Sequence, residues 1–185
     1  ITLRQLLSMS SGYPEDDPWA DRLESLPDAA YTELIGRPTT FARAPGGAFD
    51  YSNYGFTLLG RVVDRASGRP YRDLIDERIL APLGLRDTTW SHAGVDEQRL
   101  AAGYALVDGA WVEQPVQAPG AFSALGGLRS NVADLAVWVQ GFIDAFPPRD
   151  DPDGHPLSRA SRREQQQVVT ALPLCRAPVS RYNSS

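Results

Sequence analysis

Apolar residues recur at helical spacing in the segment that follows Tyr51. Steps of three and four residues place these side chains on one face of an α-helix. The helix is expected to end at Gly68, a residue type that favours helix C-termini. We expect the following side chains to face inward: Phe56, Leu59, Val62, Val63 and Ala66.

Caps and stops mark three more helices in the first half of the chain. Thr2 and Gln5 have the spacing of a capping box, which predicts a short helix through about Met9. A second helix is predicted over residues 28–35, with Gly36 as its stop. A third is predicted over residues 70–80, where Pro70 suits the first turn.

Two helices are predicted in the second half of the chain. Ser130 is expected to cap a long helix that reaches about residue 146, and Ser158 a last one that reaches about residue 170. The long helix carries a single apolar stripe that we expect to be buried. Its members are Val132, Leu135, Ala136, Val139, Phe142, Ile143 and Phe146.

One β-hairpin is predicted. Asp108-Gly109 lies between two partly alternating runs, residues 100–107 and 110–116, which is a strong hairpin signal. The fold class is therefore mainly α with a small β-hairpin. Because no segment supplies a full sheet, we interpret residues 1–185 as a single partial domain, a lobe that needs another surface.

Composition narrows the choice of partners. The 185 residues carry a net charge of −5, which argues against nucleic acid because nucleic-acid binding needs a basic face. No apolar run approaches the roughly 20 residues that span a bilayer, and we expect no signal peptide within residues 1–185. Cys175 is the only cysteine, so no disulfide forms within the chain.

All 18 basic residues are arginine, so the chain contains no lysine. This excludes a phosphate-binding P-loop, a pyridoxal Schiff base and a Ser-x-x-Lys motif within these residues. Two separated histidines and one cysteine make no zinc site, and the aspartates of residues 150–154 lack the spacing of a calcium loop. No metal or organic cofactor is therefore expected.

Tyr51-Ser52-Asn53 is the strongest candidate for chemistry, because it lies where a loop enters the best-defined helix. A phenol and a carboxamide two residues apart at such a junction can both project into one cleft. A structural alternative remains open: Asp50, Ser52 or Asn53 caps the helix, and Tyr51 is half-buried. A Ser123 triad with His92 or His155 is a weaker alternative, since the segment lacks the second glycine of a nucleophile elbow.

Three segments carry a set of motifs in order along the chain. Residues 1–13 contain Leu-Leu-x-x-x-Ser-Gly. Residues 45–90 contain a Pro-Gly turn, Tyr-Ser-Asn, Leu-Leu-Gly, a Ser-Gly stop and Pro-Leu-Gly-Leu, and residues 126–130 contain Gly-Gly-Leu-x-Ser. Together they resemble the serine β-lactamase and penicillin-binding-protein superfamily, on the side of class C β-lactamases, D-alanyl-D-alanine carboxypeptidases and related esterases. The resemblance implies the helical lobe of an α+β fold whose main antiparallel sheet is largely missing here.

The resemblance also implies a mechanism. In this family a serine of Ser-x-x-Lys attacks an amide, lactam or ester carbonyl and forms an acyl-enzyme. Tyr51 would relay protons to and from that serine, and Asn53 would hydrogen-bond the substrate and help to hold the lysine. Gly126 and Gly127 would edge the pocket. A free phenol has a pKa near 10, so such a tyrosine needs a nearby cation, and the lysine usually supplies it.

The chain departs from the family pattern in two places. It has no Ser-x-x-Lys, and His92-Ala93-Gly94, which spells His-x-Gly, comes too early and is predicted to be a surface turn. We expect a central fragment whose nucleophile and closing strand lie in other parts of the parent chain, so that the fragment alone is inactive. The alternative is a non-catalytic homologue that serves as a binding or scaffolding module. The resemblance implies a bacterial protein, either exported or cytoplasmic, and the sequence leaves the localisation unknown.

Two charged segments are interpreted as solvent-exposed. Residues 15–17 form an acidic turn that we expect to be solvated and to bind no metal. The arginine-rich residues 159–163 are expected to form the solvated face of the last helix.

Overall fold

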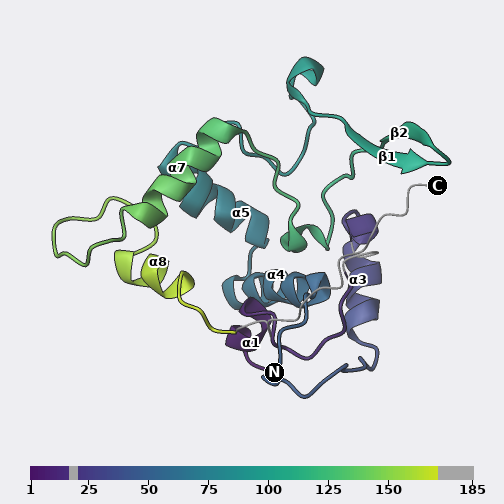
Figure 1. The fold of residues 1–185 in the computed structure, drawn as a ribbon, viewed down its shortest axis with the longest axis horizontal. Helices are drawn as coiled ribbons and strands as arrows, with labels where there is room; N and C mark the ends of the chain where they lie inside the picture. The colour runs from purple at the N-terminus through teal and green to yellow at the C-terminus, as the bar shows by residue number, and fades with distance from the viewer. Residues whose placement is uncertain (17–20, 171–185) are drawn as a thin grey trace, which may run out of the picture.

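The structure is a computed structural model that describes residues 1–16 and 21–170. Cys175 lies outside the described residues. Helices surround α4, which crosses the middle of the molecule in Figure 1, and one hairpin extends from the body at the upper right. The elements of the first half are α1 (Leu3–Leu7), η1 (Asp21–Leu23), α3 (Asp28–Ile35), α4 (Asn53–Ser67), α5 (Tyr71–Ile75), η2 (Asp76–Leu80) and α6 (Ala81–Leu83). The second half contains η3 (Glu97–Arg99), β1 (Gly103–Val107), β2 (Ala110–Gln114), η4 (Ser123–Leu125), α7 (Val132–Ile143) and α8 (Arg159–Gln165).

The expected caps of the first half are confirmed. Thr2 and Gln5 form both bonds of the capping box of α1. α3 has the predicted bounds, and Gly36 is its C-cap. Gly68 ends α4 in the left-handed conformation, with φ of 70°, which glycine adopts without a Cβ penalty. Local sequence therefore determined where these helices begin and where α3 and α4 end, whereas α1 ends at Leu7 and not at the predicted Met9.

The residues that α4 buries are small or polar. Gly55, Thr57 and Gly60 are buried, and α4 contacts α1, α5 and η4. A Cβ on Gly60 would lie 2.7 Å from the Cβ of Ala124, so this glycine allows η4 to approach the helix closely. The expected burial of the whole apolar stripe is wrong: Val62 and Val63 are 39% and 40% exposed, because no described segment covers that side.

Residues 71–83 form a continuous helical run, with a π-helical turn, η2, between α5 and α6. Gly84 ends the run in the left-handed conformation. Tyr71 contacts Trp90 edge to face, with ring centroids 5.6 Å apart. The run predicted from residues 70–80 is thus present and slightly longer.

Two details of the C-terminal helices differ from expectation. Asn131, one residue after Ser130, is the N-cap of α7, and its side chain accepts from the Asp134 N–H. Ser130 instead bonds the Thr88 hydroxyl at 2.8 Å. The helices are also shorter than predicted, since α7 ends at Ile143 and α8 at Gln165.

The apolar stripe of α7 is largely exposed, which corrects the expected burial. Val132 is 84% exposed, and Leu135, Val139 and Ile143 each exceed 50%. The spacing of these residues is that of a helix face that packs against another surface, but among residues 1–16 and 21–170 nothing covers it. The same holds for Leu3 and Leu7 of α1. The described part of the chain is thus a helical lobe with open apolar faces.

The hairpin forms with the predicted Asp108-Gly109 turn. β1 and β2 are antiparallel, and the register pairs Leu106 with Trp111 and Val107 with Ala110. Nearly every hairpin residue is exposed, including Trp111 at 72%, so this hairpin also lacks a packing surface in the described residues. Isolated two-stranded hairpins are marginally stable.

Within the described residues, no helix has both the length and the apolar character needed to cross a membrane.

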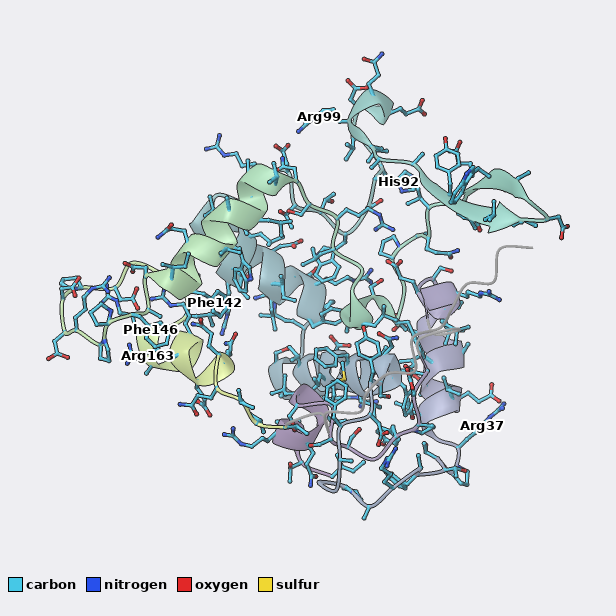
Figure 2. All side chains as sticks on the ribbon, viewed as in Figure 1. Arg37, His92, Arg99, Phe142, Phe146 and Arg163 are labelled. Carbon is cyan, nitrogen blue, oxygen red and sulfur yellow. The ribbon has the colours of Figure 1, made fainter. Side chains whose placement is uncertain are left out.

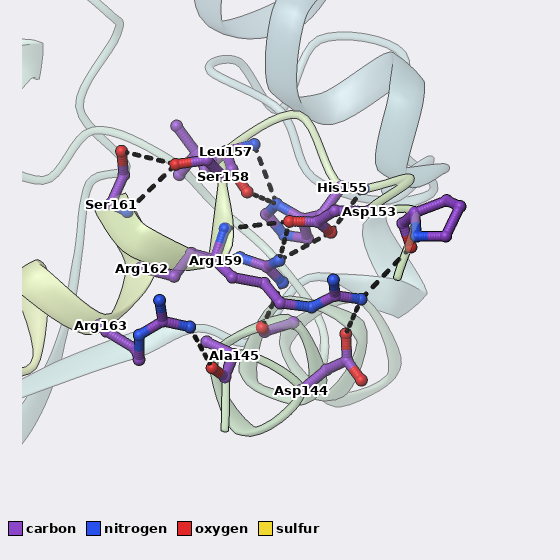
Figure 3. A network of polar contacts seen from close by, with 12 residues as sticks. Asp144, Ala145, Asp153, His155, Leu157, Ser158, Arg159, Ser161, Arg162 and Arg163 are labelled. Carbon is purple, nitrogen blue, oxygen red and sulfur yellow. Dashed lines mark hydrogen bonds and ion pairs between the residues drawn. The ribbon is translucent and has the colours of Figure 1, made fainter. Parts of the chain in front are cut away.

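The arginine-rich segment forms the start of α8 and packs against the C-terminal end of α7 and the preceding loop, which corrects its assignment as a solvated face. Arg162 is fully buried and Arg159 is 8% exposed. Arg163 donates to the Ala145 carbonyl at 2.8 Å, and Figure 2 shows it beside Phe142 and Phe146. Aspartates of the preceding loop partner the buried guanidinium groups (Figure 3), so this loop is not simply solvated either.

Candidate active site

The Tyr51–Asn53 segment forms the entry to α4. Ser52 is the N-cap, and its hydroxyl accepts from the Gly55 N–H at 3.2 Å. Tyr51 is 39% exposed, whereas Ser52 and Asn53 are 1% and 2% exposed. The capping interpretation therefore holds for Ser52, while Tyr51 keeps an accessible side chain.

The loop after α1 contacts this entry through its backbone and through the Met9 side chain. Met9 has φ of 53°, and its carbonyl accepts from the Asp50 N–H at 2.8 Å. Its sulfur lies 3.3 Å from the Ser52 nitrogen, which donates to it. The Ser10 carbonyl accepts from the Gly46 N–H at 2.7 Å. Residues 9–10 thus bind the backbone on both sides of the Tyr51 junction.

Gly12, which lies in the loop after α1, also contacts the segment that leads into α4. It has φ of 82°, and a Cβ there would lie 2.4 Å from the Arg43 carbonyl oxygen. Its own carbonyl accepts from the Ala42 N–H at 2.8 Å. Glycine is needed here for both its conformation and its lack of a side chain, and it brings the two loops together.

Asp16 is the residue that sequence reasoning missed. It lies in the acidic turn expected to be solvated, yet it is 1% exposed. Its carboxylate accepts from the N–H groups of Asn53 and Tyr54, both at 2.7 Å. Asp17, the other end of that turn, lies outside the described residues. No local pattern identifies Asp16, because its partners lie 37 and 38 residues away in the chain.

The Asn53 side chain is buried with an unused donor. Among the described residues its Nδ2 has no hydrogen-bond acceptor. A buried amide without a partner is unfavourable, so this group is available to a hydrogen-bond acceptor brought to the site. The backbone N–H of Asn53 is bonded to Asp16, whereas the side-chain Nδ2 is unused. The side chain is therefore a candidate for binding a ligand.

Gly126 and Gly127 are not part of the α4 entry that holds Tyr51 and Asn53. Both line an apolar groove of about 660 Å³, together with side chains of α4, α5 and η2, whereas Tyr51 and Asn53 do not line it. A Cβ on Gly127 would lie 2.6 Å from the Ser123 Cβ and 2.8 Å from Glu24 Oε1. Gly127 is thus required for close packing of its own loop.

Arg129 fixes that loop. Its guanidinium donates to the carbonyls of Gln117 at 2.6 Å, Trp90 at 2.8 Å and Gly127 at 3.2 Å. Its backbone pairs with Thr89 in both directions. The Gly-Gly-Leu-Arg segment is therefore rigidly held beside the groove.

The structure gives no support to a Ser123 triad. Ser123 is 1% exposed, and its hydroxyl contacts the Gly120 N–H at 2.9 Å and Glu24 at 3.5 Å. His155 contacts Leu157 instead, and burial, followed by the charge of Arg162, lowers its pKa below the usual value. His92 opens a turn closed by the Val95 N–H on its carbonyl, as predicted for His92-Ala93-Gly94.

The described residues contain no group of three or more metal-ligating side chains that could hold an ion. At the α4 entry these residues place an accessible phenol next to a buried carboxamide with an unused donor, and the glycine loop lies beside a separate groove. A phenol can exchange protons and a carboxamide N–H can bind a carbonyl oxygen, but the chain has no lysine to activate a serine.

A family model described as beta-lactamase matches residues 1–178. The chain therefore belongs to the beta-lactamase family.

Similar proteins of known name agree with this assignment. The chain is 30% identical over 156 residues to the D-alanyl-D-alanine-carboxypeptidase/endopeptidase AmpH of Escherichia coli, a match that covers 78% of this chain and 37% of that protein. It is 37% identical over 92 residues to a D-aminopeptidase of Cereibacter sphaeroides, covering 46% and 17%. The chain thus spans little more than a third of the carboxypeptidase.

Solved structures show the same fold. The octameric penicillin-binding protein homologue from Pyrococcus abyssi aligns with a TM-score of 0.70 at 27% identity, over 88% of this chain and 37% of that one. A class C beta-lactamase aligns with a TM-score of 0.63 at 21% identity, over 78% and 38%. The expected fold class, a helical lobe without the main sheet, is confirmed.

Proposed function

We propose that the full-length protein carrying this chain is a serine hydrolase that acts through an acyl-enzyme on an amide, β-lactam or ester. Tyr51 relays protons to and from the nucleophile, and Asn53 donates a hydrogen bond to the substrate. The observation that carries the proposal is the α4 entry, where an accessible phenol precedes a buried carboxamide with an unused donor. The names of the carboxypeptidase and aminopeptidase relatives support the reaction class.

The nucleophile comes from another part of the full-length protein. The chain has no lysine, so it holds no Ser-x-x-Lys, and the only His-x-Gly lies in a turn. A phenol becomes an effective base near neutral pH when a cation stabilises its anion, and arginine cannot cycle a proton as lysine can. The remaining parts of the parent chain therefore supply both the serine and its ammonium group.

In this proposal the backbone of Gly126 and Gly127 forms one side of the substrate pocket. They lie beside an apolar groove that includes Phe56, Leu59 and Leu74. A small-molecule or peptide substrate with an apolar side chain suits such a surface. No cofactor takes part.

A non-catalytic binding or scaffolding module is the alternative, favoured by the absence of Ser-x-x-Lys from these 185 residues. The sequence upstream in the parent gene discriminates between the two. A Ser-x-x-Lys a few tens of residues before Ile1 supports the enzyme, and its absence supports the binding module.

The direct test uses the full-length protein with a labelled penicillin and a labelled fluorophosphonate. We expect a stoichiometric acyl or phosphonyl adduct on a serine outside this chain. In the same protein, Tyr51→Phe should lower kcat/KM by roughly 10²–10⁴, the range for loss of a general acid–base group. Tyr104→Phe makes the same chemical change on the exposed hairpin and should leave the rate unchanged. A Tyr51→Phe rate within threefold of the original would remove Tyr51 from the mechanism.

A further inference from the structure

We propose that Asp16 is a positioning residue for the Tyr51–Asn53 pair, an inference that rests on the proposed function. Its carboxylate holds the first turn of α4 in the orientation from which both side chains project. Three observations carry this: the geometry of the carboxylate, its burial and its separation in sequence from the helix it caps.

The carboxylate uses both oxygens on consecutive residues. Oδ1 accepts from the Asn53 N–H at 2.7 Å, and Oδ2 accepts from the Tyr54 N–H at 2.7 Å. The Ser52 hydroxyl also donates to Oδ2 at 3.3 Å. Two short bonds from one rigid group fix the rotation of the turn as well as its position.

Asp16 and Ser52 together cap the N-terminus of α4. The first N–H groups of a helix have no partner within it. Asp16 satisfies those of Asn53 and Tyr54, and Ser52 satisfies that of Gly55. Ser52 alone would cap the helix in the ordinary way. The second cap therefore adds constraint at the two positions nearest the candidate chemistry.

The cap is delivered from a distant segment that is itself anchored on α4. The Tyr13 ring contacts the Tyr54 ring edge to face, with centroids 5.0 Å apart, and stacks on Phe41 at 5.1 Å. Asp16 is 1% exposed, so water competes little for its oxygens. A displacement of this segment would turn the start of α4, and with it the Tyr51 phenol and the Asn53 amide.

Catalysis is sensitive to such displacements, since about 1 Å of misplacement can cost about 10²-fold in rate. Asp16→Asn in the full-length protein keeps one oxygen acceptor but replaces the other with an NH₂ group that cannot accept from an N–H. We expect kcat to fall at least about 10-fold with little change in KM, measured with nitrocefin and p-nitrophenyl acetate as probes. Circular dichroism at the assay temperature establishes that the variant is folded.

A second measurement separates positioning from simple stabilisation. If Asp16 acts in part through Tyr51, the effects of the two changes should be less than additive, so Asp16→Asn should slow the Tyr51→Phe protein by a smaller factor than it slows the original protein. Asn131→Ala, which removes the cap of α7, is the matched control: it should lower the melting temperature but leave kcat unchanged. Asp16→Ala, which removes both acceptors, should lower kcat at least as far as Asp16→Asn.

The outcomes are distinct. A drop for both single variants without additivity supports the inference. Two results would overturn the role of Asp16 and leave the proposed function standing, both with a slow Tyr51→Phe protein. In the first, the kcat of Asp16→Asn matches that of the Asn131→Ala control. In the second, the effects of Asp16→Asn and Tyr51→Phe are fully additive. An unimpaired Tyr51→Phe overturns the proposed function, and the Asp16 inference with it.

Discussion

Arg162 of α8 donates two hydrogen bonds to the carboxylate of Asp153, at 2.7 and 2.8 Å, although its guanidinium side chain is only 1% exposed. The same guanidinium donates to the Gly141 carbonyl of α7 (Figure 3). A single buried cation thus joins α8, the preceding loop and α7. A buried charge is tolerated only when it is paired and hydrogen-bonded.

We expect Asp153→Ala to destabilise the protein strongly, because it leaves Arg162 buried without its counter-ion. The loss of stability should exceed that from breaking an exposed ion pair, because the Arg162 side chain is only 1% exposed. Denaturant unfolding of the full-length protein measures it. Glu33→Ala breaks the exposed Arg37 pair and should cost under about 1 kcal/mol. Equal effects of the two variants would contradict a structural role for Arg162.

The stability of the α7–α8 region should fall with acidification. Burial, followed by the charge of Arg162, lowers the pKa of His155, and a hydrogen bond with the Leu157 backbone and the carboxylates of Asp153 and Asp144 oppose the shift. Because the folded state binds this proton less readily than the unfolded chain, whose histidine titrates near 6.5, the contribution of His155 is present above pH 6.5. It is lost as the pH falls from there through the lower folded pKa.

Melting temperatures between pH 5 and 8 test this linkage. His155→Gln cannot take up the proton, so its melting temperature should fall less between pH 7 and 5 than that of the unmodified protein. His92→Gln is the matched loss of the other histidine. An unchanged slope in His155→Gln would show that His155 does not contribute.

Gly127→Ala should destabilise the loop beside the groove. Its Cβ would lie 2.6 Å from the Ser123 Cβ, which forces buried neighbours to move, and overpacking of this kind costs about 1–3 kcal/mol. Gly154→Ala, which meets nothing within 4 Å, should change the melting temperature little. A Gly127→Ala protein with unchanged stability but a raised KM would instead favour direct contact of Gly127 with substrate.

Asn53→Ala should lower kcat/KM by about 10²-fold, the effect of losing one donor to a developing negative charge. The donor is the Nδ2 that has no acceptor among the described residues. Assays with nitrocefin and p-nitrophenyl acetate measure the change. A rate within threefold of the original would mean that the amide has a packing role only.

The 185-residue chain by itself should form no adduct with a labelled penicillin or fluorophosphonate, because it lacks the lysine-activated serine. Mass spectrometry of the labelled chain measures this, with the full-length protein as the positive control. A stoichiometric adduct would show that the nucleophile lies within these residues.

The sequence by itself determined the local elements and the family. The α1 capping box, the bounds of α3, the Gly68 stop and the Asp108-Gly109 hairpin all follow from short-range backbone chemistry, and all are present. The order of the Leu-Leu, Tyr-Ser-Asn and Gly-Gly-Leu segments indicated the family that the comparison with known proteins established. Each of these signals lies within a few residues of the feature it predicts.

Tertiary structure alone decided which charged and apolar residues are buried. Arg162 and Asp16 belong to segments that look solvated, yet each meets polar partners that are distant in sequence and that offset the loss of water. The stripe of α7 looks buried, yet Val132 and Ile143 are exposed among the described residues. Periodicity reports which face of a helix is apolar. Burial depends on what packs against that face, and this follows from long-range contacts that spacing along the chain does not encode.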